Sequence, residues 1–322
     1  MLTFPDLKAK QILFVQTEHN AKNRLYFKNE NIVFEKEGKL VNQASCHRVL
    51  AVFVIGDFTF TSGLVKECRR RAVSLFFLGN NFGLYGALNA KAEGNYLLRE
   101  KQYKTNKSEE LEYAKNIVKN KIQNQIYLLA RAGGLIADLE SAISTSIIKT
   151  ENSEQLLGVE GSFTKIFFNE YFVEIDWLRR MPRVKPDIPN YLLDMGYTLL
   201  FNFIDSLLQL FGFDTYKGVY HKLFFQRKSL TCDIIEPFRC IIEKQLIKSY
   251  HLKQINSENF FVDGRKYVLE YKHSQKYAAI FMEAIMEQKE NIYLFIQQYY
   301  RHIMNSKKYH FPNFNLGKNN IK

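Results

Sequence analysis

Residues 49–55 read Val-Leu-Ala-Val-Phe-Val-Ile, seven apolar residues in a row that end at a Gly-Asp pair. An unbroken apolar run of this length, rich in β-branched side chains, is typical of a strand buried on both faces. Residues 73–78 (Val-Ser-Leu-Phe-Phe-Leu) repeat the pattern. Between the two, residues 61–71 predict a short helix with Ser62 as its N-cap and apolar side chains on one face.

Shorter strand patterns flank this pair. β-branched and aromatic side chains form short runs at residues 11–16, 24–28, 31–35 and 84–88. Asn29-Glu30 separates two of these runs with a two-residue turn, and a polar turn with a glycine follows at residues 36–39. Seven or so short strands around one helix predict a small β-sandwich over residues 1–90.

After Gly94 the spacing of apolar residues changes to that of helices. A helix is predicted from Ser108, with Glu109 and Glu110 in the first turn where the helix dipole favours carboxylates, to Gly133-Gly134. Further helical patterns cover residues 135–149, 154–172, 190–210, 233–248 and 275–305.

The two patterns together predict an α+β protein. A β-rich domain of residues 1–90 precedes a mostly α-helical domain of residues 91–322, and the boundary is expected at residues 89–96, which are polar and contain a glycine. The tail from residue 305 to residue 322 is polar and basic, so we expect it to be frayed.

The composition narrows the class of protein. The 322 residues are 46% hydrophobic, which excludes disorder as the main state, and no stretch approaches 18 uncharged apolar residues, so we expect no membrane span. The first 11 residues lack the apolar core of a secretory signal. The four cysteines form no CxxC pair, which favours a reduced cytoplasmic protein. The 45 Lys and Arg against 33 Asp and Glu give a net charge of +12, which favours a polyanionic partner.

Four side chains stand out as candidates for chemistry. Glu160 lies among Leu, Val and Gly residues, where a carboxylate needs a base or a metal as partner. Asp233 and Glu236 are three residues apart, so they share one face of a helix. With His221 they offer hard oxygen ligands and one imidazole, a set that suits Mg²⁺ or Mn²⁺. Carboxylates in a first helical turn are also common caps, and the spacing alone leaves that interpretation open.

Four sequence blocks carry a resemblance to a known family. Residues 158–168 (GVEGSFTKIFF) are similar to an E-G-x-x-A-x-x-Y-F motif, and residues 183–197 to a segment with basic residues, prolines, an Asn and Gly-Tyr. Residues 212–221 match G-x-D-x-x-x-G-x-x-H, and residues 229–239 match S-L-x-x-D-L-x-E-x-F-R. In this order the blocks resemble the integrases of CRISPR adaptation, the "Cas-one" family, and the likeness spans about residues 10–245. Thr164 and Phe167 depart from the first motif, where the family has Ala and Tyr. Phe167 has no hydroxyl, so a substrate contact through the tyrosine hydroxyl of the family does not carry over to position 167.

The resemblance implies a reaction and a site. Such a protein is a metal-dependent DNA endonuclease and integrase, in which a free 3′-hydroxyl on a short DNA fragment attacks a phosphodiester of the CRISPR repeat by transesterification. Glu160, His221 and Glu236 would then be the ligands of Mg²⁺ or Mn²⁺. Asp233 would orient His221 or a water, or be an alternate ligand. The implied partners are double-stranded DNA fragments, CRISPR repeat DNA and a small companion Cas protein, with a homodimer made by the β domain.

Basic clusters support DNA as the partner, because they would track phosphates along a strand. Together with the tyrosine of the second block, the predicted DNA-binding residues are Arg69, Arg70, Arg71, Arg179, Arg180, Arg183, Lys185, Tyr197, Arg227 and Lys228. A solvated surface is the alternative for any one of these pairs.

Two other functions remain open at this point. The chain could be a free-standing, structure-specific nuclease that acts on branched DNA with the same metal site. It could also be a DNA-binding scaffold without catalysis, although it keeps all four acid and imidazole positions.

Overall fold

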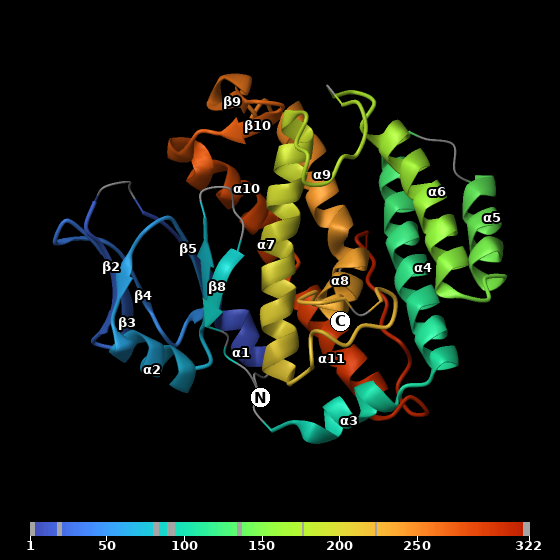
Figure 1. The fold of residues 1–322 in the computed structure, drawn as a ribbon, viewed down its shortest axis with the longest axis horizontal. Coiled ribbons are helices and arrows are strands. Elements are labelled where there is room, and N and C mark those ends of the chain that lie inside the picture. The colour runs from blue at the N-terminus through green and yellow to red at the C-terminus, as the bar shows by residue number, and fades with distance from the viewer. Residues whose placement is uncertain are drawn as a thin grey trace.

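The computed structural model describes residues 4–17, 21–79, 84–88, 90, 94–133, 137–175, 177–222 and 224–317. A strand-rich N-terminal part is followed by a helical part, and the two lie side by side (Figure 1). The predicted α+β class is confirmed. Among the described residues, no helix is both long enough and apolar enough to cross a membrane.

The first sheet is built around the apolar run at residues 49–55. Its strand order is β1-β5-β7-β8, with β1 (Gln11–Gln16), β5 (Val49–Ile55), β7 (Ser74–Leu78) and β8 (Leu84–Leu88). β1, β5 and β7 are parallel and β8 is antiparallel. Every residue of β5 is buried, as the unbroken apolar run predicts.

The second sheet has the order β4-β3-β2-β6, with β4 (Lys39–Ser45), β3 (Asn31–Lys36), β2 (Asn23–Lys28) and β6 (Thr59–Phe60). Asn29 and Glu30 both adopt positive φ in the turn between β2 and β3, as a tight two-residue hairpin requires. Helix α2 (Ser62–Arg70) is capped by Thr61 rather than by Ser62. Side chains of both sheets and of α2 share one apolar core, so this part is a small sandwich.

The opposite face of the first sheet packs on the helical part. Phe53, Ile55 and Phe76 belong to the same continuous core as the central helix α7 (Ile188–Phe211). The hydroxyl of Tyr271 also reaches the sheet, where it donates to the carbonyl of Thr17 and lies 3.2 Å from that of Ile55. The two parts are therefore joined by a common core rather than by a linker alone.

The remaining elements surround α7 (Figure 1). In chain order they are α1 (Phe4–Ala9), α3 (Tyr96–Lys104), α4 (Lys107–Arg131), α5 (Ala137–Ile148), α6 (Ser153–Tyr171), α8 (Ser229–Ile235), η1 (Glu236–Phe238), α9 (Arg239–His251), η2 (Ser257–Asn259), β9 (Phe260–Asp263), β10 (Lys266–Leu269), η3 (Tyr271–His273), α10 (Ser274–Glu287) and α11 (Lys289–Met304). β9 and β10 form a separate hairpin.

Three helix predictions are corrected. α4 begins one residue before Ser108, and its cap is Asn106, which forms a capping box with Glu109. The run predicted at residues 233–248 begins instead at α8 and is interrupted by the 3₁₀ turn η1, where Pro237 has no N–H to donate. The run predicted at residues 275–305 is two helices that meet at Gln288.

The prediction of a frayed tail is wrong for the described part. Phe314 is buried, and its backbone is hydrogen-bonded to α4. The segment is polar overall, so its composition did not indicate that an apolar side chain such as Phe314 is buried.

Candidate active site

A buried lysine lies between two of the predicted carboxylates. Lys121 comes from α4, Glu160 from α6 and Glu236 from η1. The Lys121 ammonium contacts Glu160 Oε1 and lies 2.8 Å from Glu236 Oε2. The side chain of Lys121 is 7% exposed and that of Glu236 is 5% exposed, so these charges meet with little water between them.

The neighbouring charges keep this cluster ionised. Burial alone would raise the pKa of Glu236, but Arg239 and Lys121 outweigh it and hold the pKa at about 2. Burial alone would lower the pKa of Lys121, yet Glu236 and Glu160 raise it above its usual value. Glu236 is therefore a carboxylate, and Lys121 an ammonium, at neutral pH.

Asp233 holds His221 from the other side of the site. Asp233 is fully buried in α8, and its two oxygens accept backbone N–H groups from Val219, Tyr220 and His221 at 2.6, 3.1 and 2.8 Å. Asp233 Oδ1 also lies 2.7 Å from His221 Nδ1. A Cβ atom at Gly218 would lie 2.6 Å from Asp233 Oδ2, so only glycine lets the loop come this close.

This arrangement selects the histidine atom that is available for chemistry. When Nδ1–H of His221 donates to Asp233, the tautomer leaves the lone pair on Nε2. A carboxylate behind a histidine in this way is the usual support of a metal-binding imidazole. Asp233 thus holds the imidazole of His221 and the loop that carries it, and it lies inside α8 rather than at its N-cap.

Two further side chains reach Glu160. Thr164, one of the departures from the motif, donates its hydroxyl to Glu160 Oε1 at 3.2 Å. The hydroxyl of Tyr220 lies 3.5 Å from Glu160 Oε2, and burial raises the pKa of this tyrosine. The other departure, Phe167, is fully buried and stacks on Tyr171 with ring centroids 5.1 Å apart. It therefore belongs to the core.

The donor set fits a hard divalent ion by its chemistry. Glu160 and Glu236 offer carboxylate oxygens, and His221 offers one nitrogen. Their donor atoms are not all within 4.8 Å of one another. Coordination of one ion therefore requires these side chains to move toward one another.

Among the described residues, Glu30, Cys46 and His47 of the sandwich have donor atoms that all lie within 4.8 Å of one another. Both oxygens of Glu30 already accept from the Arg71 guanidinium, at 2.8 and 2.6 Å. Burial raises the pKa of the Cys46 thiol, which disfavours the thiolate that a metal needs. We assign no site there.

The predicted DNA-binding residues fall into two groups. Arg69, Arg70, Arg179, Arg183 and Arg227 have exposed side chains, and Lys185 is half-buried above the ring of Tyr191.

The second group is engaged inside the fold. Arg71 binds Glu30 and Glu67, and Arg180 binds Asn190 and Asp194. Lys228 lies 2.7 Å from the buried Asp205, and the Tyr197 hydroxyl donates to Glu243 at 2.8 Å. Lys228 therefore holds the fold, contrary to expectation, and so does Tyr197.

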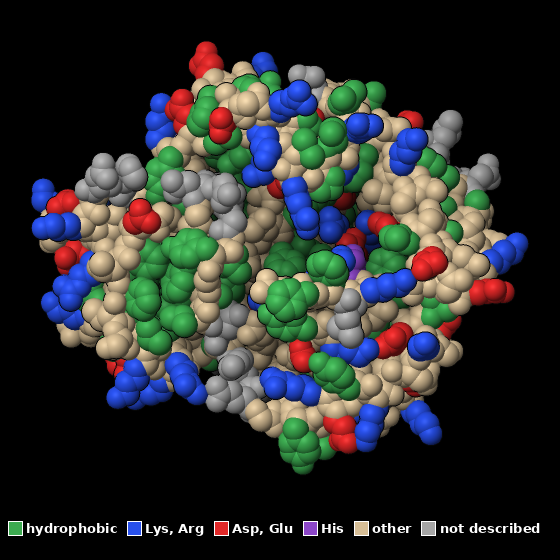
Figure 2. Space-filling model, viewed as in Figure 1, with side chains coloured by type: hydrophobic (Ala, Val, Ile, Leu, Met, Phe, Trp, Pro, Cys, Tyr) green, Lys and Arg blue, Asp and Glu red, His purple; other side chains and the backbone are tan. Residues whose placement is uncertain are grey.

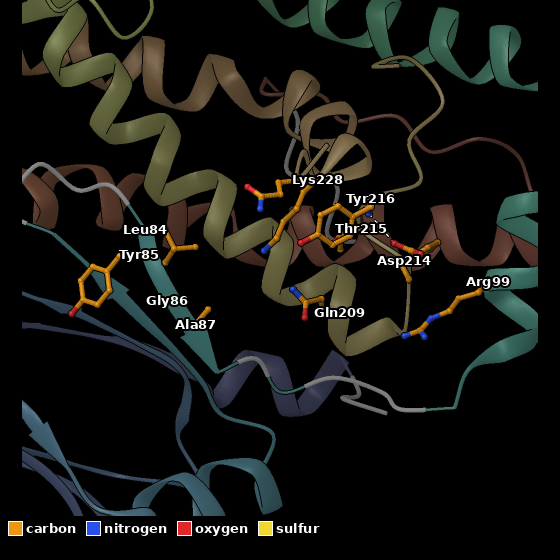
Figure 3. Close-up of a pocket in the computed structure, with 12 residues that line it drawn as sticks. Leu84, Tyr85, Gly86, Ala87, Arg99, Gln209, Asp214, Thr215, Tyr216 and Lys228 are labelled. Atoms are coloured by element: carbon orange, nitrogen blue, oxygen red, sulfur yellow. Dashed lines mark hydrogen bonds between the residues drawn. The ribbon is translucent and has the colours of Figure 1, made fainter. Parts of the chain in front are cut away.

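A cavity of about 750 Å³ lies between the sandwich and the helical part (Figure 3). β8 forms one wall with Leu84 and Ala87, and the opposite side carries Gln209 of α7, Tyr216 and Lys228. None of the four predicted catalytic residues lines it. It lies beside the loop that follows His221.

Sequence reasoning gave no site role to the two cations, Lys121 and Arg239, although Arg239 ends the fourth block. A signal for Lys121 was present, because it follows Ile117 and Val118 by four and three residues and so lies on the apolar face of its helix. A lysine at such a position needs a buried partner.

The family described as "CRISPR associated protein Cas1" matches residues 16–283. The chain belongs to the Cas1 family. Among its relatives is "CRISPR-associated endonuclease Cas1 1" of Thermodesulfovibrio yellowstonii, which is 28% identical over 249 residues, 72% of this chain and 78% of the relative. "CRISPR-associated endonuclease Cas1 3" of Thermus thermophilus is 28% identical over 222 residues, 65% of each chain.

Solved structures share the fold of this Cas1 chain. A "Casposase bound to integration product" has a TM-score of 0.80 at 18% identity and covers 92% of each chain. A CAS1 protein from Thermotoga maritima has a TM-score of 0.78 at 18% identity, covering 92% of this chain and 97% of its own. A chain of a "Cas6-RT-Cas1--Cas2 complex" has a TM-score of 0.78 at 22% identity and covers 96% of this chain and 36% of that one.

Proposed function

We propose that this Cas1 protein is a metal-dependent DNA endonuclease and integrase of CRISPR adaptation. It joins the 3′-hydroxyl of a short DNA fragment to the CRISPR repeat by transesterification. The observation that carries the proposal is the convergence of Glu160 and Glu236 on one buried point beside a histidine that Asp233 orients. The names of its relatives support a CRISPR-associated endonuclease.

Glu160, Glu236 and Nε2 of His221 would hold Mg²⁺ or Mn²⁺. When bound, the ion supplies a Lewis acid that lowers the pKa of the attacking hydroxyl and stabilises charge on the phosphate. No side chain of the protein needs to become a covalent intermediate, because the hydroxyl of the DNA is the nucleophile.

Other side chains of the protein hold the three proposed ligands in position. The hydrogen bond from His221 Nδ1 to Asp233 fixes the tautomer, so Nε2 can act as a ligand only while the imidazole is neutral. Lys121 and Arg239 hold the two glutamates in place.

The surface around the site suits DNA. Figure 2 shows a hollowed face with Lys and Arg side chains gathered around its rim over the helical part. The loop after His221 exposes Lys222 and Arg227, and between them Phe224 and Phe225 are 73% and 83% exposed. Cations that flank exposed rings suit phosphates and unpaired bases, and binding should weaken with salt.

The partners follow from the same proposal. Residues 1–90 would form the homodimer and residues 91–322 would carry the catalytic domain. A small companion Cas protein would complete the complex, an assignment supported by the Cas1–Cas2 complexes among the structures of this fold. A cytoplasmic location fits both the DNA partner and the absence of predicted disulfides.

The experiment is half-site integration at fixed Mn²⁺, with a labelled 3′-hydroxyl DNA and a plasmid that carries the CRISPR repeat. Glu160→Ala, His221→Ala and Glu236→Ala should each lower the rate at least about a hundredfold while DNA binding holds, since each removes a ligand. Glu112→Ala, an exposed carboxylate on α4, is the control. Glu236→Ala should lower the integration rate more than Asp233→Ala does. If Asp233→Ala lowered the rate more, Asp233 would be the ligand and Glu236 the supporting residue.

The products separate the proposal from its alternatives. Strands joined to the repeat support the integrase. Cleavage of flaps or forks without joining would support the free-standing nuclease instead. Full activity of Glu160→Ala would refute the metal site. If the unmodified protein showed no metal-dependent activity, the chain would be a DNA-binding scaffold without catalysis.

A further inference from the structure

The C-terminal segment, residues 311–317, runs along α4 and is held there by two buried asparagines (Figure 1). Asn120 donates to the carbonyl of Phe314 at 2.6 Å and accepts its N–H at 2.9 Å. One helical turn later, Asn124 donates to the same carbonyl at 3.0 Å and accepts the N–H of Leu316 at 2.9 Å. The two amides thus bind alternate residues of an extended chain, as a neighbouring strand would.

The segment is also anchored by its apolar side chains. The ring of Phe314 is buried, with its centroid 4.7 Å from that of Phe238, the last residue of η1. A Cβ atom at Gly317 would lie 2.5 Å from the ring of Tyr127, so the chain passes close to α4 here as well. Contacts at both ends fix the segment in one place.

The same contacts reach the residues of the proposed site. The side chain of Asn124 donates to the carbonyl of Pro237 at 3.3 Å, and Pro237 directly follows Glu236. Asn120 directly precedes Lys121, which contacts Glu236. A single three-residue 3₁₀ turn has little stability of its own, so packing from outside must set the position of η1.

We propose that residues 311–317 are a positioning strap, which fixes η1 and so holds the Glu236 carboxylate in place beside Lys121 and Glu160. The proposal rests on the proposed function only in taking Glu236 as a metal ligand. The strap touches neither DNA nor the reacting atoms, and it acts through Phe238 and Asn124.

The test uses the full chain with Phe314→Ala, Asn124→Leu and the conservative variant Phe314→Leu. Asn116→Leu is the matched control, because Asn116 lies on the same helix and is exposed, with its amide bonded within α4. Two quantities are measured well below the unfolding temperature. They are hydrogen exchange of the backbone amides within residues 236–240, all except that of Pro237, and Mn²⁺ binding by electron paramagnetic resonance of the free ion.

Phe314→Ala and Asn124→Leu should speed exchange at residues 236–240 by about tenfold or more, with no change in the β2–β3 hairpin. Mn²⁺ affinity should fall by about five- to tenfold, and Phe314→Leu should recover most of it. DNA affinity, measured with a chelator present, should stay within about twofold.

Unchanged exchange at residues 236–240 would overturn the strap, as would a lower unfolding temperature with full Mn²⁺ affinity. The proposed function fails separately. If Glu236→Ala bound Mn²⁺ like the unmodified protein, the ligand assignment would be wrong, whereas the exchange result would still report on the strap.

Discussion

Five ionisable side chains cluster at the centre of the helical part. Lys121, Glu236 and Glu243 are buried, and Glu160 and Arg239 are partly exposed. Lys121 and Arg239 balance the charges of Glu160 and Glu236. The fifth group differs, because burial raises the pKa of Glu243 to about 7 despite the hydrogen bond from Tyr197. Each buried charge needs its partner, since removing one leaves another unpaired in a medium of low polarity.

Lys121→Met should therefore be strongly destabilising. The substitution keeps the length of the side chain but leaves Glu160 and Glu236 close together with less positive charge. We expect a loss of about 3–5 kcal/mol in the free energy of unfolding at pH 7, measured by urea denaturation. The control is Lys115→Met on the same helix, whose partner Glu112 is exposed and whose loss should stay under about 1 kcal/mol. Equal small losses would contradict the interpretation of a buried charge cluster.

Glu243 should make stability depend on pH near neutrality. Its carboxyl binds a proton more tightly in the folded protein than in the unfolded chain, because its pKa is raised from 4.5 to about 7. The stability it contributes is therefore complete below about pH 4.5 and is lost as the pH rises to about 7, by up to roughly 3 kcal/mol. Glu243→Gln should remove this dependence in denaturation curves between pH 5 and 8. A variant with the same pH profile as the unmodified protein would show that Glu243 does not titrate in this range.

At the scale of elements, the sequence predicts best what depends on local patterns. The unbroken apolar run of β5 and the two-residue turn at Asn29-Glu30 follow from neighbours along the chain, and both are confirmed. The single helix predicted at residues 233–248 is wrong, because the apolar pattern runs on through Pro237 although the structure has α8, η1 and α9 there. The ordered tail could not be predicted, since its partners lie 190 or more residues away on α4.

The candidate site shows the same limit. The positions of Glu160, His221, Asp233 and Glu236 came from motifs. The structure pairs Glu160 and Glu236 through Lys121, and it pairs His221 with Asp233. For Lys121, the only signal in the sequence is the position of a lysine on the apolar face of a helix. The contact between Lys228 and Asp205 was not predictable, because no pattern links a loop cation with a carboxylate inside α7.

The loop between His221 and α8 allows a comparison of two adjacent cations. Arg227 is exposed, whereas Lys228 is paired with the buried Asp205. Arg227→Ala should weaken DNA binding and reduce the slope of log affinity against log salt by about 1, with an unchanged melting temperature. Lys228→Ala should instead lower the melting temperature, because the buried Asp205 loses its cation and keeps only the neutral side chains of Thr231 and Gln209 as hydrogen-bond donors among the described residues. Fluorescence anisotropy across a salt series and thermal unfolding measure the two effects, and exchanged outcomes would contradict the assignment.

On the scale of the whole molecule, the sandwich and the helical part share one core. Deleting residues 1–90 would therefore expose apolar side chains of the helical part, and it would not be a clean test of dimerisation. Point substitutions on the outer surface of the sandwich test dimerisation without exposing this shared core.

An apolar patch on the sandwich is the surface where we expect the second copy. Four rings lie together, those of Phe58, Phe60, Phe77 and Tyr85, with centroid distances of 5.3 to 6.3 Å between neighbours. Tyr85 is 63% exposed and Phe60 is 45% exposed. Figure 2 shows hydrophobic side chains gathered on this side of the molecule. Exposed patches of this kind mark contact sites, and β8 is also an open edge of its sheet.

The double variant Phe60→Glu/Tyr85→Glu should be monomeric by light scattering, because two facing copies would bury four new carboxylates without partners. Its melting temperature should stay within a few degrees of that of the unmodified protein, since both side chains are exposed. The control is Leu40→Glu/Val41→Glu on β4, the edge strand of the other sheet, where both residues are exposed as well. If the control alone became monomeric, the β4 edge would be the interface. If both variants stayed dimeric, neither the aromatic patch nor the β4 edge would be the interface.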